Sequence, residues 1–113
     1  MQSIVDIMAT ALPCPVRANT GRLGAEVAEY AFNTTLYNGA RREARMKVQI
    51  CARTMARGLQ LEKLLDEALV KQGDRPLTPT CVSCQRNGGG WLVDGDWHIR
   101  IAYYDLILRV PRA

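Results

Sequence analysis

The sequence of 113 residues predicts an α+β fold, with about four helices first and a small three-stranded antiparallel sheet last. In residues 1–73, apolar side chains recur every three to four positions, which is typical of amphipathic helices. Residues 91–110 instead hold short apolar runs around an Asp-Gly dipeptide, as expected of a hairpin. Between them, residues 74–90 are rich in proline and glycine and are expected to form an irregular loop. A chain of this length builds one hydrophobic core, so we expect residues 1–113 to form a single domain.

Two helices are predicted in the first third of the chain. The first covers residues 2–12 and stops before Pro13, because proline inside a helix removes a backbone hydrogen bond. The second is capped by Asn19 or Thr20 and ends at Gly39, which suits a left-handed residue after a helix.

Two further helices are expected over residues 40–57 and 60–72, each followed by a glycine. In the sheet, the two-residue period of a strand places Trp97, Ile99 and Ile101 on one face, which we expect to point inward. Leu106–Val110 is expected to form the third strand, after a turn at Tyr104-Asp105.

The composition limits where the protein acts. The longest apolar stretches are far shorter than the roughly 18 residues that a membrane span requires, so we expect no membrane association. The first residues lack the basic segment of a secretory signal, and the four cysteines are expected to be reduced thiols. We therefore expect a cytoplasmic protein.

The strongest local signal is positive charge. The chain carries a net charge of +4, and the region between Gly39 and Gly58 more than accounts for it. On the predicted helix over residues 40–57, one face is apolar and another carries most of the arginines. The candidate binding residues on this segment are Arg41, Arg42, Arg45, Arg53 and Arg57.

An arginine-rich helix face has three interpretations. Guanidinium groups bind phosphate oxygens in a bidentate manner, which indicates nucleic acid as a partner. The same charges suit an acidic protein surface. They are also compatible with a solvated helix face that binds nothing, which is the commonest role of charge runs on helices.

Cys81 and Cys84 form a Cys-x-x-Cys motif, which is half of a structural zinc site. The other candidate ligands are Cys14, Cys51 and His98, and none of these has the spacing of a second ligand pair. We therefore predict no metal and no other cofactor, with zinc at Cys81 and Cys84 as the alternative.

Tyr103 and Tyr104 are adjacent, so a continuous strand cannot turn both of them inward. One of the two is therefore a candidate contact for a partner or for a second copy in a homodimer. A free edge of the antiparallel sheet offers another way to bind a partner strand.

Catalysis is not predicted. His98 is the only histidine, and neither a nucleophile motif nor a phosphate-binding loop accompanies it. Our leading hypothesis is a small non-catalytic accessory protein of a bacterium, plasmid or phage that binds a protein or nucleoprotein complex stoichiometrically. A regulator or an inhibitor of the anti-CRISPR kind is an example. The alternative is a protein that binds nucleic acid directly through the arginine-rich helix.

Overall fold

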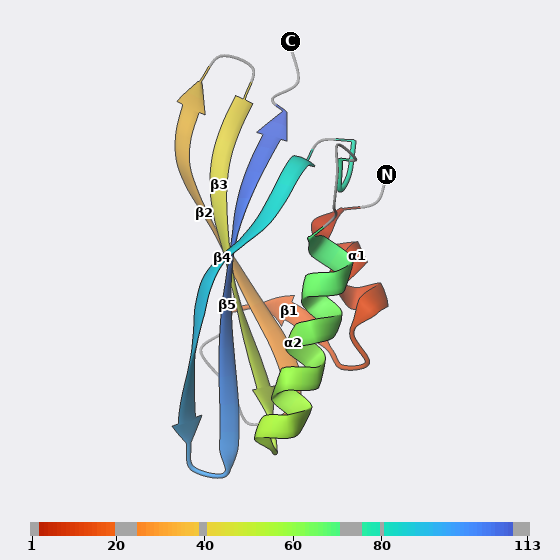
Figure 1. Ribbon diagram of the computed structural model, residues 1–113, viewed down its shortest axis with the longest axis vertical. Coiled ribbons are helices and arrows are strands. Elements are labelled where there is room, and N and C mark those ends of the chain that lie inside the picture. Colours follow the sequence, from red (N-terminus) through yellow and green to blue (C-terminus); the bar gives the residue numbers. More distant parts are fainter. Residues whose placement is uncertain (1–2, 20–24, 39–40, 71–75, 80, 110–113) are drawn as a thin grey trace.

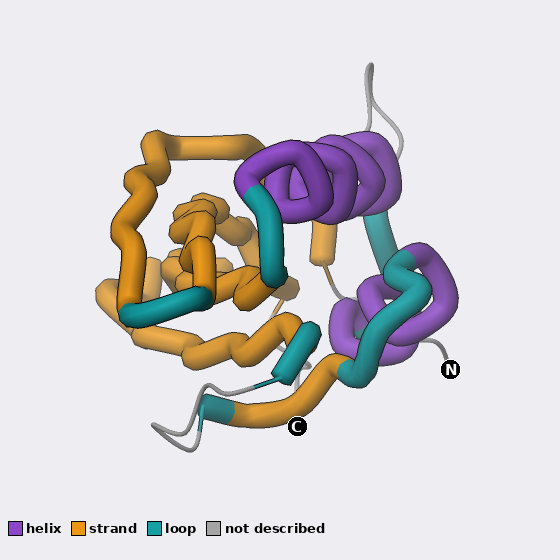
Figure 2. Tube along the Cα trace, turned by 90° about the horizontal axis from the view of Figure 1, so that it is seen from below, coloured by secondary structure: helices purple, strands orange, loops and turns teal. Residues whose placement is uncertain are grey.

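The computed structural model describes residues 3–19, 25–38, 41–70, 76–79 and 81–109. These residues form two helices and one five-stranded mixed sheet, and both helices lie on the same side of the sheet (Figures 1 and 2). The elements in chain order are α1 (Ile4–Ala11), β1 (Val16–Ala18), β2 (Val27–Asn38), β3 (Arg41–Ala52), α2 (Met55–Leu69), β4 (Cys81–Asp94) and β5 (Trp97–Arg109).

The strands are arranged in the order β1-β2-β3-β5-β4, so β4 forms one edge of the sheet. The short strand β1 lies parallel to β2 at the other edge, and every other pair of neighbours is antiparallel. The β2–β3 hairpin extends toward one end of the molecule and the β4–β5 hairpin toward the opposite end (Figure 1). The protein is consequently elongated, with extents of 48 × 24 × 24 Å.

The predicted fold of four helices and a three-stranded antiparallel sheet is therefore wrong. Most of the segment expected to form the second helix is the long strand β2, and most of the segment expected to form the third is the long strand β3. The expected helix end at Gly39 lies outside the described residues. Local spacing misled the prediction because side chains four residues apart share a face in a strand as well as in a helix.

β3 shows the actual period clearly. Its buried residues occupy every second position, whereas the residues between them are largely charged or polar. The residues buried on the helix side are Ala44, Met46, Val48, Ile50 and Ala52, and Cys51 near the end of the strand is buried on the opposite face. This alternation belongs to a strand with one face against the core, and it rules out the arginine-rich helix over residues 40–57.

The first predicted helix is confirmed as α1. Ser3 caps it through a reciprocal pair of hydrogen bonds with Asp6, each of 3.2 Å. α2 is also present where the fourth helix was expected, but it begins earlier, at Met55 after the cap Thr54. Gly58 lies inside α2 and does not end a helix, and Arg100 of β5 approaches it closely. A Cβ atom added there would lie 3.0 Å from Cγ of Arg100.

The hairpin at the end of the chain is confirmed, but it is longer than expected. β4 starts at Cys81, inside the predicted loop of residues 74–90, and β5 continues through the predicted turn at Tyr104-Asp105. Asp94 pairs with Trp97, so the turn consists of Gly95 and Asp96. Gly95 has a positive φ of 59°, which a residue without a Cβ adopts at no steric cost.

The main core lies between the helices and the even-numbered side chains of β3 and β5. Its most enclosed members are Met8, Met46, Val48, Ile50, Leu61, Leu65, Leu69, Ala102, Tyr104 and Leu106. The predicted inward set of Trp97, Ile99 and Ile101 is on the opposite face, where it packs around Val27 and Cys51 in a second, smaller cluster. The helices thus cover the face of β5 that was expected to point outward.

Candidate functional site

The structure distributes the predicted basic site over several places. Arg41 begins β3, and Arg42 points to the helix side of the sheet, whereas Arg45 points to the open side. Arg53 follows β3, and Arg57 lies in the first turn of α2. The four of these arginines whose side chains the structure describes therefore do not form one continuous face that tracks a phosphate backbone.

Several of these arginines contact residues of the same chain. Arg57 donates a hydrogen bond of 2.6 Å to Glu26, and this bond is the main reason why the pKa of Arg57 is raised. Arg45 lies 3.3 Å from the carboxylate of Asp105, and the guanidinium carbon of Arg53 lies 4.5 Å from the ring centre of Trp97. Such contacts are those of a solvated, locally paired surface.

The two adjacent tyrosines point to opposite faces, as the strand geometry requires. Tyr104 is fully buried, and its hydroxyl donates a 2.5 Å hydrogen bond to Asp66 of α2. Burial raises the pKa of Tyr104, and the bond to Asp66 adds to this effect. Tyr103 is partly exposed on the open face, 6.0 Å below the guanidinium of Arg45. Of the pair, only Tyr103 has the exposure that contact with a partner requires.

Cys81 and Cys84 both lie on β4 and are buried beneath the helices. A bulge between Cys81 and Ser83 brings the two thiols to the same face of the strand. Burial raises the pKa of Cys81, and it raises the pKa of Cys84 to about 12. Among the described residues, no group of three or more His, Cys, Asp or Glu side chains is placed to hold a metal. The expectation that no metal is bound, with zinc at Cys81 and Cys84 as the alternative, remains a prediction.

β4 carries a surface that the sequence analysis anticipated only as a free sheet edge, without naming its residues. It is an edge strand, and near its end Trp91, Leu92 and Val93 are 52%, 42% and 52% exposed. No charged residue occurs between Gly88 and Val93. Monomeric proteins usually protect an exposed edge strand with charge, proline or a covering element. We call residues 88–93 the β4 edge segment.

The backbone of the β4 edge segment is held close to β5. A second bulge between Arg86 and Gly89 precedes it, and Gly88 adopts a positive φ of 88°. A Cβ atom at Gly89 would lie 2.6 Å from the carbonyl oxygen of Ile101, a distance that no side chain tolerates. The glycines therefore shape the strand just before the apolar residues.

A network of charged groups fastens α2 to the sheet. Arg100 of β5 makes two hydrogen bonds of 3.2 Å to Glu62, and Arg86 of β4 lies 3.5 Å from the same carboxylate. Arg86 also binds both carboxylate oxygens of Asp66. Neither the charge pattern nor the motifs of the sequence indicated this network, because its members come from three distant segments. It is a structural element that fixes the position of β4.

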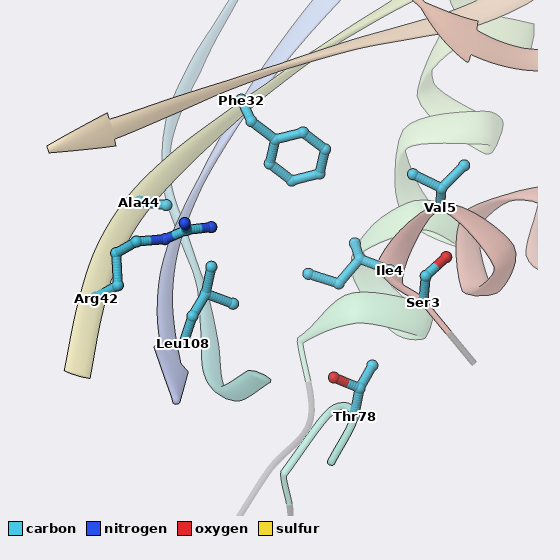
Figure 3. Close-up of a pocket in the computed structure, with 8 residues that line it drawn as sticks. All are labelled: Ser3, Ile4, Val5, Phe32, Arg42, Ala44, Thr78 and Leu108. Carbon is cyan, nitrogen blue, oxygen red and sulfur yellow. The ribbon is translucent and has the colours of Figure 1, made fainter. Parts of the chain in front are cut away.

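A pocket of about 320 Å³ lies between α1 and the helix side of the sheet (Figure 3). Its apolar walls are Ile4, Val5, Phe32, Ala44 and Leu108. The guanidinium of Arg42 extends among these side chains, and the hydroxyls of Ser3 and Thr78 are at the opposite side (Figure 3). We call this site the Arg42 pocket. It uses one of the predicted binding residues in surroundings that the sequence did not suggest.

Of the helices in the described ranges, none is long and apolar enough to cross a membrane.

No protein-family model matches the sequence, and no curated protein matches it. Among solved structures, a chain in the structure described as "Virion of native gene transfer agent (GTA) particle" is similar, with a TM-score of 0.59 and 14% sequence identity. The match covers 96% of this chain and 86% of that one. At this identity, the similarity shows that the two chains share a fold.

Proposed function

We propose that this protein is a non-catalytic component of a phage-like particle and that it binds a neighbouring protein of that particle through the β4 edge segment. The observation that carries the proposal is the exposure of Trp91, Leu92 and Val93 at an edge of the sheet. Three consecutive large apolar side chains in water are unfavourable, and a protein interface removes them from it.

The chemistry of the segment suits a protein partner. An edge strand presents backbone groups that pair with an added strand, while its side chains supply specificity. Tryptophan is also among the residues that contribute most to binding when an interface buries them. The absence of charge from Gly88 to Val93 in the sequence means that no desolvation of an ion opposes such contact.

The structural neighbour supports the particle context. That chain belongs to the structure of a native gene transfer agent virion. The shared fold spans nearly the whole of the present chain, and we extend the particle context to this protein by analogy of fold. The extension is our proposal.

Two earlier hypotheses are affected differently. The nucleic-acid alternative depended on an arginine-rich helix, and that helix does not form. The narrower hypothesis of a stoichiometric regulator or anti-CRISPR-like inhibitor stays a prediction, since an inhibitor also needs an exposed protein-binding surface. The two roles differ in where the protein is found, either in particles or bound to a free target complex.

The test uses tagged protein in its native host. We would collect particles by sedimentation after nuclease treatment and measure the tagged chain in the pellet. The double variant Trp91→Lys, Val93→Lys places charge on the β4 edge segment without touching the core. Ala9→Lys adds charge to an exposed position of α1, far from the hairpin, and is the control.

The proposal predicts that the unaltered chain and Ala9→Lys sediment with particles, whereas the double variant remains in the supernatant although its thermal unfolding is unchanged. Recovery of the unaltered chain only in the supernatant, bound to a protein complex unrelated to particles, would favour the inhibitor hypothesis. Equal incorporation of the double variant would show that the β4 edge segment is not the interface.

A further inference from the structure

The Arg42 pocket combines apolar walls with one positive charge, and this combination selects a particular kind of ligand. We propose that the pocket binds the carboxyl-terminal residue of a partner polypeptide when that residue has an apolar side chain. The site lies on the helix side of the sheet, between α1 and strands β2, β3 and β5, and the β4 edge segment contributes nothing to it. The inference is therefore independent of the proposed function.

Charge complementarity identifies the carboxylate. Arg42 is the only charged residue among the described side chains that line the pocket. A guanidinium keeps its charge in proteins and presents a planar pair of donors that matches a carboxylate. A charge-assisted hydrogen bond of this kind is shorter and stronger than a neutral one, and apolar surroundings strengthen it further.

The walls identify the apolar part of the ligand. Five of the eight lining residues have hydrocarbon side chains, and Phe32 is 47% exposed where its ring faces the pocket (Figure 3). A purely ionic ligand such as free phosphate would also place polar oxygens against these walls, where they lose hydration and gain no hydrogen bond. The ligand must therefore carry its anion beside an apolar group.

The volume of the pocket suits a ligand that inserts one or two side chains. Pockets that hold small molecules range over roughly 300–1,000 Å³, and the volume here, about 320 Å³, is at the lower limit. A dinucleotide or another large cofactor does not fit in this space. A leucine, isoleucine or phenylalanine with its terminal carboxylate is of suitable size.

The neighbouring strand indicates that the ligand belongs to a polypeptide. β1 pairs with β2 only from Ala28 to Tyr30, and Asn19 adds one backbone hydrogen bond of 2.9 Å to the carbonyl of Tyr30. Phe32 is two residues farther along β2, where no strand in the described ranges continues this edge. Alternate residues of a strand direct their backbone groups to the same edge, so Phe32 directs its N–H and C=O to the edge on which Ala28 and Tyr30 bond to the β1 segment, which is where an extended peptide would pair.

The experiment is a methyl NMR titration of the whole chain, observing Ile4, Val5 and Leu108. The first probe is an acetylated pentapeptide, Thr-Val-Thr-Val-Leu, with a free carboxylate, and the second is the same peptide as its amide. N-acetyl-leucine is the third probe, and it represents a free apolar acid. The variants are Arg42→Met, Arg42→Lys and, as a matched control, Arg109→Met, which removes an exposed arginine next to Leu108 on the opposite face of β5.

We expect the peptide acid to shift these methyl signals and the amide to bind about tenfold more weakly, because the charge-assisted bond is lost. Arg42→Met should lower the affinity for the acid by a similar factor, Arg42→Lys should restore part of it, and Arg109→Met should bind like the unaltered protein. Equal binding of acid and amide, absence of shifts at the pocket, or an unchanged affinity of Arg42→Met would overturn the proposal. If N-acetyl-leucine bound as tightly as the peptide, the ligand would be a free acid, and the assignment to a polypeptide would be wrong.

Discussion

Arg86 of β4 donates hydrogen bonds of 2.9 Å from one guanidinium nitrogen to both carboxylate oxygens of Asp66 on α2. The hydroxyl of Tyr104 donates to the same carboxylate from β5. One acidic side chain thus connects the second helix to both strands of the terminal hairpin, and the β4 edge segment projects from that hairpin. Its exposed tryptophan and valine are held by this connection as well as by strand pairing.

Replacing Asp66 with alanine should lower the free energy of unfolding by about 2 kcal/mol, because a partly buried guanidinium and a buried hydroxyl would lose their partner. The estimate is below that for a fully buried pair because Asp66 and Arg86 keep 36% and 26% of their side-chain exposure. Urea denaturation measures the change. Glu67→Ala is the matched control on the same helix, since its 4.0 Å pair with Lys63 is exposed and should contribute less than about 0.5 kcal/mol. Equal effects of the two variants would refute this role of Asp66.

Stability should decrease in alkaline solution partly because of Cys84. Burial raises its pKa from 9.0 to about 12, so between these values the folded protein holds a proton that the unfolded chain releases. The unfolded state then binds fewer protons, and the free energy of unfolding falls as the pH rises from about 9 toward 12. The melting temperature from pH 7 to 11 measures this dependence. Cys84→Ala should show a shallower decline over the same range, whatever its stability at pH 7, and an identical slope would contradict the assignment.

Thiol reactivity offers a separate measurement on the same residues. All four cysteines are free, and Cys51, Cys81 and Cys84 are buried whereas Cys14 is half-buried. At pH 8 we expect a thiol-specific reagent to modify at most Cys14 in the folded protein, because burial both hinders access and disfavours the reactive thiolate. The other thiols should react once denaturant is added. Rapid modification of Cys81 or Cys84, identified by peptide mass, would mean that β4 separates readily from the helices.

Part of the local structure was predictable from the sequence. Pro13 limits the first helix, the leucine stripe of α2 has a helical period, and Asp94-Gly95 marks the hairpin. These signals depend on backbone chemistry within a few residues. They were right because no distant contact opposes them.

The central strands were mispredicted because the helical period and the two-residue period of a strand place the same residues on one face at some positions. Ala44 and Val48 are four residues apart, so they share a face in a helix and also in a strand. Met46 and Ile50 decide between the two, since a helix places them beside the arginines and a strand places them with Ala44 and Val48. Both are fully buried, which shows that tertiary pairing with β2 and β5 determines the conformation of this segment.

The candidate sites were harder to predict than the elements. The exposure of Trp91 follows from the position of β4 at the edge of the sheet, and strand order is not encoded in local spacing. The Arg42 pocket likewise brings together residues from α1, β2, β3 and β5. Arg42 itself was identified as a binding residue, but for a helix face that does not exist.

The two neighbouring glycines Gly89 and Gly90 should respond very differently to alanine. At Gly89 the new methyl group would lie 2.5 Å from a guanidinium nitrogen of Arg86 and 2.6 Å from the carbonyl oxygen of Ile101. The side chain of Arg86 can move, although it would then leave Asp66, but the backbone of β5 cannot move without breaking the ladder. We expect Gly89→Ala to destabilise the protein by about 1–3 kcal/mol, the usual cost of forcing an extra group into a packed site.

At Gly90 a Cβ meets nothing within 4 Å, so Gly90→Ala should be neutral or should stabilise by up to about 1 kcal/mol through the unfolded state. Chemical denaturation of the two variants makes the comparison, and similar stabilities would mean that β4 and β5 do not approach each other as closely as the bulge at Gly89 requires.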